Sequence, residues 1–229
     1  MRAGRGIYKL GILVLLLSTI SCTYFSEYAK LERSARDSYG RADYDAAVFM
    51  LARSLQMSQD YEKSQILMAD AFLMANRGHN NKISELEASS NDFRYDGLSR
   101  EYQSLVNLHD EVKNLPPVRH PKTGLLLELE IIDFSPQLAD AKQMAAESHY
   151  AAGTALSISP DLSQQKAAAK QFKKASSFVP GYKDSKSRYE ATRQAGVKRI
   201  AVFPFEDLSG KNKRYGAIEE LVVDQMVTS

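Results

Sequence analysis

The stretch "SQQKAAAKQFKKASSFVPGYKDSKSRYEATRQAG", residues 163–196, decides the fold predicted for this chain. Ala168, Phe172, Ala175 and Pro180 follow one another at intervals of four, three and five residues. The first two intervals place three side chains on one face of a helix. The alanines let a second helix approach closely, Phe172 fills the groove between the two helices, and Pro180 stops the helix. The stretch therefore predicts one helix of a packed hairpin.

Further helices are predicted on the N-terminal side of this stretch. Residues 135–159 supply the partner helix, whose inner face is expected to carry Leu138, Ala141, Ala145, Ala152 and Ala155. Near the N-terminus, "GRADY" (40–44) separates two runs of helical periodicity. These runs predict a first hairpin that buries Leu31, Ala35 and Tyr39 from one helix and Ala47, Met50, Leu51 and Leu55 from the other.

Both hairpins resemble tetratricopeptide repeats. Residues 163–180 look like the second helix of such a repeat, and "YGRADYDAAVFMLARSL" (39–55) matches the family at Ala47 and Leu51, with Ser54 replacing the usual small alanine. The resemblance covers about half of the chain in two degenerate units. It implies a mainly α fold, an α-solenoid of helical hairpins with a surface that binds other proteins.

The segment between the hairpins breaks the repeat. "SREYQSLVNLHDEVKNL" (99–115) predicts a helix that "PPVRHPKTG" (116–124) ends. In "LLLELEIIDF" (125–134), alternation at Leu127, Leu129 and Ile131 favours a strand, whereas the leucines and glutamates favour a helix. We expect a short extended element packed on the helices, within an irregular insertion near 115–136 of a helical domain that spans 22–196.

The N-terminus has the layout of a secretory signal. Residues 1–21 combine a basic beginning with an apolar core, "LGILVLLL", that is too short for a typical membrane span. The sole cysteine, Cys22, follows, and "TISC" (19–22) resembles a bacterial lipobox, with Thr19 where leucine is commonest. This resemblance implies a lipoprotein with acyl chains such as palmitate on Cys22. Since Thr23 is not the aspartate that signals inner-membrane retention in that family, it implies the outer membrane. An ordinary cleaved signal is the alternative, and an uncleaved anchor is a weaker one.

The C-terminal part, residues 197–229, predicts a strand followed by a helix. "RIAVFPFEDLSG" (199–210) and "YGAIEELVVDQMV" (215–227) resemble the opening of the curli-secretion-channel family (CsgG-like) and of lipoproteins that activate peptidoglycan synthases. The matching residues are Ile200, Ala201, Val202, Pro204, Phe205, Gly210, Tyr215 and Gly216. The resemblance implies the start of an incomplete α/β domain. Because a lone strand leaves its edges unpaired, self-association through it is expected; a terminal strand and helix packed on the repeats is the alternative.

No catalytic or metal-binding pattern stands out in the sequence. The histidines at 79, 109, 120 and 149 have no second ligand at helical spacing. We expect His149 to serve in packing or in interhelical hydrogen bonding, with acid–base catalysis as the alternative. "GKN" at Gly210 lacks the second glycine and the hydroxyl of a phosphate-binding loop. With 30 basic and 28 acidic residues, the charge gives no argument for a nucleic-acid partner. We expect a non-enzymatic protein without a cofactor or metal.

These features together predict a lipid-anchored scaffold or adaptor that faces the periplasm and binds other envelope proteins through its helical-repeat surface. Two alternatives follow from the resemblance of the tail. One is a component of a curli-type secretion or outer-membrane assembly system, and the other is a regulator of peptidoglycan synthesis. In each case the lipid on Cys22 would attach the protein to the membrane.

Overall fold

The computed structural model describes residues 26–197, and over this range the chain is mainly helical. This confirms the helical fold class predicted from the sequence. Cys22 and the tail residues from 198 to 229, with their predicted strand and helix, lie outside the described residues. The seven helices of the described part are α2 (Glu27–Gly40), α3 (Tyr44–Met57), α4 (Glu62–Ala88), α5 (Arg94–Lys113), α6 (Ser135–Ser157), α7 (Leu162–Phe178) and α8 (Ser185–Ala195).

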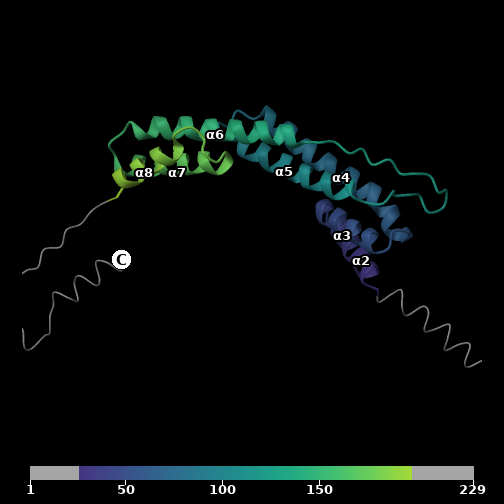
Figure 1. Cartoon of the computed structure of the whole chain (residues 1–229). Helices are drawn as coiled ribbons and strands as arrows, with labels where there is room; N and C mark the ends of the chain where they lie inside the picture. The colour runs from purple at the N-terminus through teal and green to yellow at the C-terminus, as the bar shows by residue number, and fades with distance from the viewer. Residues whose placement is uncertain (1–25, 198–229) are drawn as a thin grey trace, which may run out of the picture.

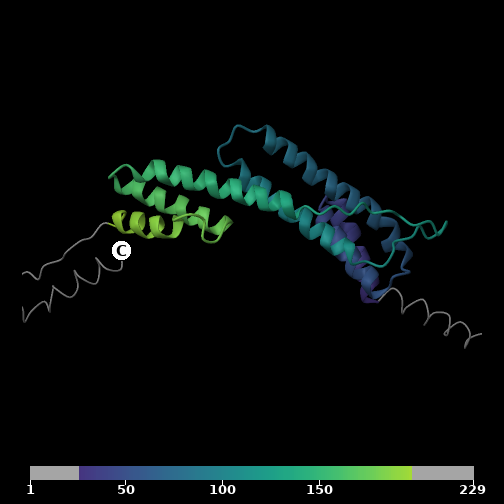
Figure 2. The ribbon, with the colours of Figure 1, turned by 45° about the horizontal axis from the view of Figure 1, so that its top comes forward.

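The helices form an elongated, curved row in which each packs on the next (Figure 1). α2 and α3 lie at one end of the row, and α7 and α8 lie at the other, in both views (Figure 2). Near the first end, α2 also contacts α4, and α3 also contacts α5. The row therefore consists of antiparallel hairpins stacked along one direction.

The buried core of the described residues is divided along this row. A first apolar cluster joins α2, α3 and α4 to the end of α5, a second joins α4, α5 and α6, and a third joins α6, α7 and Tyr182. Each helix thus buries apolar surface mainly against its neighbours along the chain, as helices do in repeat arrays. No single central core holds the two ends together within residues 26–197.

Short polar residues begin two of the helices. The Asp43 carboxylate accepts a hydrogen bond from the Ala46 N–H at the start of α3, and the Asp161 carboxylate accepts one from the Ser163 N–H at 2.6 Å at the start of α7. After α7, Pro180 lies exposed in a turn where Gly181 has a φ of 76°. Since such a φ favours glycine, Gly181 suits the reversal from α7 into α8.

The segment 114–134, here called the arm, connects α5 to α6 without helix. Its two limbs approach each other at one isolated antiparallel bridge between Arg119 and Leu126. Leu127 and Leu129 are half-buried against the first apolar cluster. The arm is therefore extended and packed on the helices, although Ile131 is exposed.

The buried face of α6 differs from the predicted one in its second half. Leu138, Ala141 and Ala145 are buried, whereas Ala152 is half-buried and Ala155 is exposed. The predicted inner face of α6 is thus wrong at Ala155. The reason is that α6 packs first on α5 and then on α7, so the buried face shifts along the helix to Ala146, His149 and Gly153.

Candidate functional site

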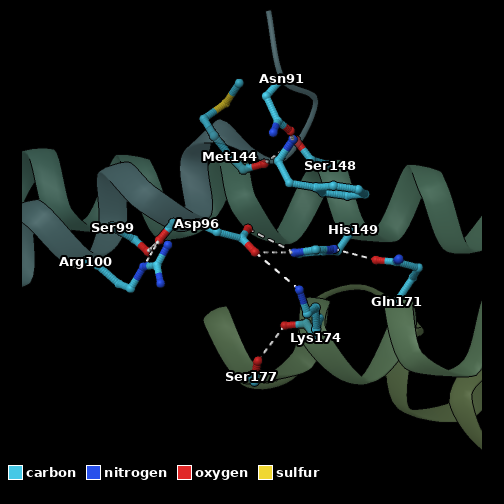
Figure 3. Close-up of polar contacts among 11 residues, drawn as sticks. Asn91, Asp96, Ser99, Arg100, Met144, Ser148, His149, Gln171, Lys174 and Ser177 are labelled. Atoms are coloured by element: carbon cyan, nitrogen blue, oxygen red, sulfur yellow. Dashed lines mark hydrogen bonds and ion pairs between the residues drawn. The ribbon is translucent and has the colours of Figure 1, made fainter. Parts of the chain in front are cut away.

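The most densely connected polar group surrounds His149, whose side chain is 0% exposed in α6. Its Nε2 lies 2.9 and 3.1 Å from the two carboxylate oxygens of Asp96 in α5 (Figure 3). Because an ionised carboxylate can only accept, Nε2–H is the donor. On the other side of the ring, Nδ1 lies 2.6 Å from Oε1 of Gln171 in α7. His149 thus connects three helices, which confirms its predicted interhelical role.

Aromatic rings and a lysine complete this group. Phe93 stacks on the imidazole at a centroid distance of 4.5 Å and Phe178 stacks at 5.7 Å, so that the His149 ring has an aromatic partner in the turn before α5 and another at the end of α7. Lys174 Nζ lies 3.4 Å from Asp96 Oδ2. We call this group the second joint, because a similar group lies earlier in the chain. It consists of Phe93, Asp96, His149, Gln171, Lys174 and Phe178.

A first joint of the same design surrounds His79 in α4. Its Nε2 lies 3.0 Å from both carboxylate oxygens of Asp45 in α3, and its Nδ1 lies 2.7 Å from Glu101 Oε2 in α5. The hydrogen bond with Asp45 is the main cause that raises the pKa of His79, against burial, which lowers it, and Glu101 raises it further. Lys82 lies 3.8 Å from Glu101.

The two joints share a spacing that the sequence reasoning missed. In each, the histidine lies 22 residues before its partner on the following helix, Glu101 or Gln171. In each, the aspartate follows a tyrosine at the start of a helix, as Tyr44 and Asp45 or as Tyr95 and Asp96. The repeated Tyr-Asp pair is a sequence feature that the two joints share, although its separation from the histidine differs, at 34 and 53 residues.

A third histidine, His109 in α5, holds the arm. Its Nε2 lies 2.7 Å from Asn76 Oδ1 in α4, and its Nδ1 accepts a hydrogen bond from the Ile132 N–H at 3.1 Å. Burial lowers the pKa of His109, although Asp110 and Glu130 oppose this shift. Since Nδ1 must stay unprotonated to accept from Ile132, the neutral ring is the form that fits this contact.

The chemistry open to these groups is limited by access and by bonding. The His149 ring is fully buried, and both nitrogens of His79 already face carboxylates. Within residues 26–197, no set of three or more histidine, cysteine, aspartate or glutamate side chains could hold a metal ion. Every buried side-chain nitrogen or oxygen in this part of the chain has a hydrogen-bond partner. The arrangement suits a structural role, in which each histidine links neighbouring hairpins through hydrogen bonds.

The residues chosen from the sequence fall into two separate places. Ala47 and Leu51 are buried in the first apolar cluster, whereas Ala168, Phe172 and Ala175 are buried on α7 at the opposite end of the row. The structure does not bring the two sets together. Pro180 follows the end of α7. Cys22 and the tail residues Ile200, Val202, Pro204, Phe205, Gly210, Tyr215 and Gly216 lie outside the described residues.

Comparison with protein-family models gave no match, and comparison with curated proteins gave none either. Of the helices in the described part, each is too short or too polar to cross a lipid bilayer.

The first joint predicts a pH-dependent stability. Because the folded-state pKa of His79 is raised, its contribution is fully present below the unfolded value of about 6.5 and is lost as pH rises through the folded value. We expect His79→Gln to lower the free energy of unfolding on the acidic side of this window. The free energy of unfolding of the variant should then decrease less as pH rises. Urea unfolding between about pH 5 and about pH 9 measures this.

His109→Gln is the matched control, because the sign is opposite there. The lowered pKa of His109 gives a contribution that is present above about 6.5 and is lost as pH falls. The two variants should therefore change opposite sides of the stability profile. Parallel profiles for His79→Gln and the unmodified chain would show that the carboxylates of the first joint do not bind the protonated ring preferentially.

Proposed function

We propose that this protein is a lipid-anchored scaffold or adaptor that faces the periplasm from the outer membrane and binds other envelope proteins through a helical-repeat surface of the tetratricopeptide type. The observation that carries the proposal is the linkage of successive hairpins by buried histidine joints into one elongated row. A row of this kind exposes an extended surface that can bind other proteins. Binding of protein segments is the use that such a surface supports best.

Exposed apolar side chains on α4 give the proposal a specific surface. Ile66 is 52% exposed and Leu73 is 54% exposed, and their spacing of seven residues places both on one helical face. Large apolar side chains gathered on an exposed face are typical of interaction sites. We expect this face to contact a partner, since the buried residues of α4 already pack inside the row.

The interaction surface can be tested by capture from envelope extract. We expect the double variant Ile66→Glu and Leu73→Glu to lose proteins that the unmodified chain retains. The matched control is Lys63→Glu, because Lys63 is an exposed α4 residue that adds a carboxylate without removing apolar surface. Equal retention by all three would remove the α4 face from the proposal. Unchanged helical content by circular dichroism shows that a loss is not due to unfolding.

The membrane anchor is proposed from the sequence around Cys22. One acyl chain gives only marginal residence in a membrane, whereas the several chains of a lipoprotein give stable attachment. We therefore expect Cys22→Ser to move the protein from the membrane fraction to the soluble fraction after high-salt and carbonate washing. Retention of the variant in the membrane would contradict the anchor. Recovery of the unmodified protein in the inner membrane would contradict the expected location alone.

A further inference from the structure

The arm contains a groove that is not filled by the packing of the helices and is not part of either joint. It has a volume of about 790 Å³ and lies between the limb 115–118 and the limb 126–131. Val112 and Val118 are buried along it, and Leu127 and Leu129 are half-buried. The groove is therefore apolar on the side of the helices and open to solvent on the other.

Two prolines explain why the limbs separate. Next to the Arg119–Leu126 bridge, Leu127 N–H donates to Val118 C=O at 2.8 Å. Continued in the same register, Pro117 would face Glu128 and Pro116 would face Leu129. Pairs alternate between hydrogen-bonded and non-hydrogen-bonded in an antiparallel ladder, so Pro116 and Leu129 would be the next hydrogen-bonded pair, and Pro116 has no N–H to donate. The pairing ends there, and the limb 126–131 is left with an open backbone edge.

The open edge has unused hydrogen-bonding groups. Within residues 26–197, the N–H groups of residues 128–131 make no hydrogen bond to another residue, whereas the N–H of Ile132 bonds to His109. In an extended limb, the N–H groups of Leu129 and Ile131 share the edge on which Leu127 N–H bonds to Val118. Side chains alternate along the limb, because Leu127 and Leu129 face the helices while Glu128 and Glu130 are exposed. An extended segment with apolar residues at every second position could pair with this edge and cover the groove.

We infer that the groove binds the segment Arg199–Phe203 of a second copy of this chain by strand addition. In "RIAVF", Ile200 and Val202 share one face of a strand, and Arg199 shares the other face with Ala201 and Phe203. When Ile200 and Val202 lie beside Leu127 and Leu129, Arg199 lies on the same side as Glu128 and Glu130. Ile200 and Val202 then match the apolar side of the limb, and the charge of Arg199 is opposite to that of the two glutamates.

The donor is a second copy because the distance within one chain is too large. The arm extends toward the end of the row that holds α2 and α3, whereas Val197 follows α8 at the other end (Figure 1). Phe203 lies six residues beyond Val197, a reach of at most about 22 Å. The helix α6, which the row contains between these ends, is about 35 Å long on its own.

Such a contact joins different surfaces of the two copies. A head-to-tail contact of this kind closes into a ring or continues as an open chain. The inference goes beyond the proposed binding of envelope proteins and does not depend on the lipid on Cys22. Its failure would leave the anchor and the α4 surface unaffected, and their failure would not affect it.

Molar mass at increasing protein concentration tests the inference. We expect residues 23–229 to form dimers and larger species, and residues 23–196 to stay monomeric. Within 23–229, Leu129→Pro removes one N–H of the edge and should abolish association. The double variant Glu128→Lys and Glu130→Lys, which alters only exposed side chains, should weaken it by at least tenfold and guards against misfolding of the proline variant. A monomeric 23–229, or association that persists in 23–196, would overturn the inference.

A mixing experiment assigns the two surfaces. Residues 23–229 carrying Leu129→Pro offer an intact donor segment and a blocked groove, whereas residues 23–196 offer an intact groove and no donor. Each should be monomeric alone, and the mixture should form a one-to-one heterodimer that grows no further. A mixture that stays monomeric would show that the groove is not the receptor, and the inference would fall. Restoration of association when Arg199→Glu is combined with the two lysines would identify the charge contact.

Discussion

Replacement of Phe172 with alanine is expected to lower the free energy of unfolding by about 3–5 kcal/mol, the usual cost of truncating a buried phenylalanine. The side chain is 0% exposed, and the Tyr150 ring meets it edge-on at a centroid distance of 5.7 Å. A Cβ built on Gly153 would lie 3.0 Å from the Phe172 ring, so α6 approaches α7 closely at this point and leaves no slack. A domain is stable by only about 5–15 kcal/mol, so this loss is large.

The change should be concentrated at one end of the row. Because each hairpin depends mainly on its neighbours, α6, α7 and α8 should lose amide protection before α2 and α3 do. Urea unfolding gives the total loss, and hydrogen exchange locates it. Phe49→Ala, at a phenylalanine that is 39% exposed in α3, is the matched control and should cost far less. Equal losses for both variants would show that burial at Phe172 does not determine the packing of α7.

The helical character of the chain could be predicted because it depends on local patterns. The spacing of Ala168, Phe172 and Ala175 reports a helix face whatever lies opposite it, and all three are buried. The extended arm was predictable for a similar reason, since prolines end the preceding helix and alternation follows them. The prediction failed at Ala155, because the buried face of a long helix changes when its neighbour changes from α5 to α7.

The joints could not be predicted from such patterns. Asp45 lies 34 residues before His79, and Asp96 lies 53 residues before His149, so each contact depends on which helices become neighbours. Periodicity treats each helix alone and leaves a buried histidine unexplained. The second joint also takes Gln171 and Lys174 from a helix whose other face holds Phe172. A helix chosen for its apolar face thus brings the polar partners of His149 with it.

Replacement of Asp96 with alanine should therefore lower the stability of the row and make its two ends unfold less cooperatively. The change leaves the buried Nε2–H of His149 without its acceptor, which costs about 1–3 kcal/mol. It also removes a connection between hairpins, so unfolding should broaden or divide into two transitions. Urea unfolding followed by circular dichroism measures both effects.

Asp70→Ala, at an exposed α4 carboxylate, is the matched control and should change stability by no more than about 0.5 kcal/mol. The double variant Asp96→Leu and His149→Leu removes both polar partners. It should recover part of the loss, because a buried pair replaced by apolar groups leaves no unsatisfied donor. The difference between this double variant and the sum of Asp96→Leu and His149→Leu, each measured alone, isolates the contact. If that difference is zero, His149 and Asp96 contribute to stability independently, and the second joint does not couple α5 to α6. A clear positive coupling means that the contact of the buried histidine makes neighbouring hairpins unfold as one cooperative unit.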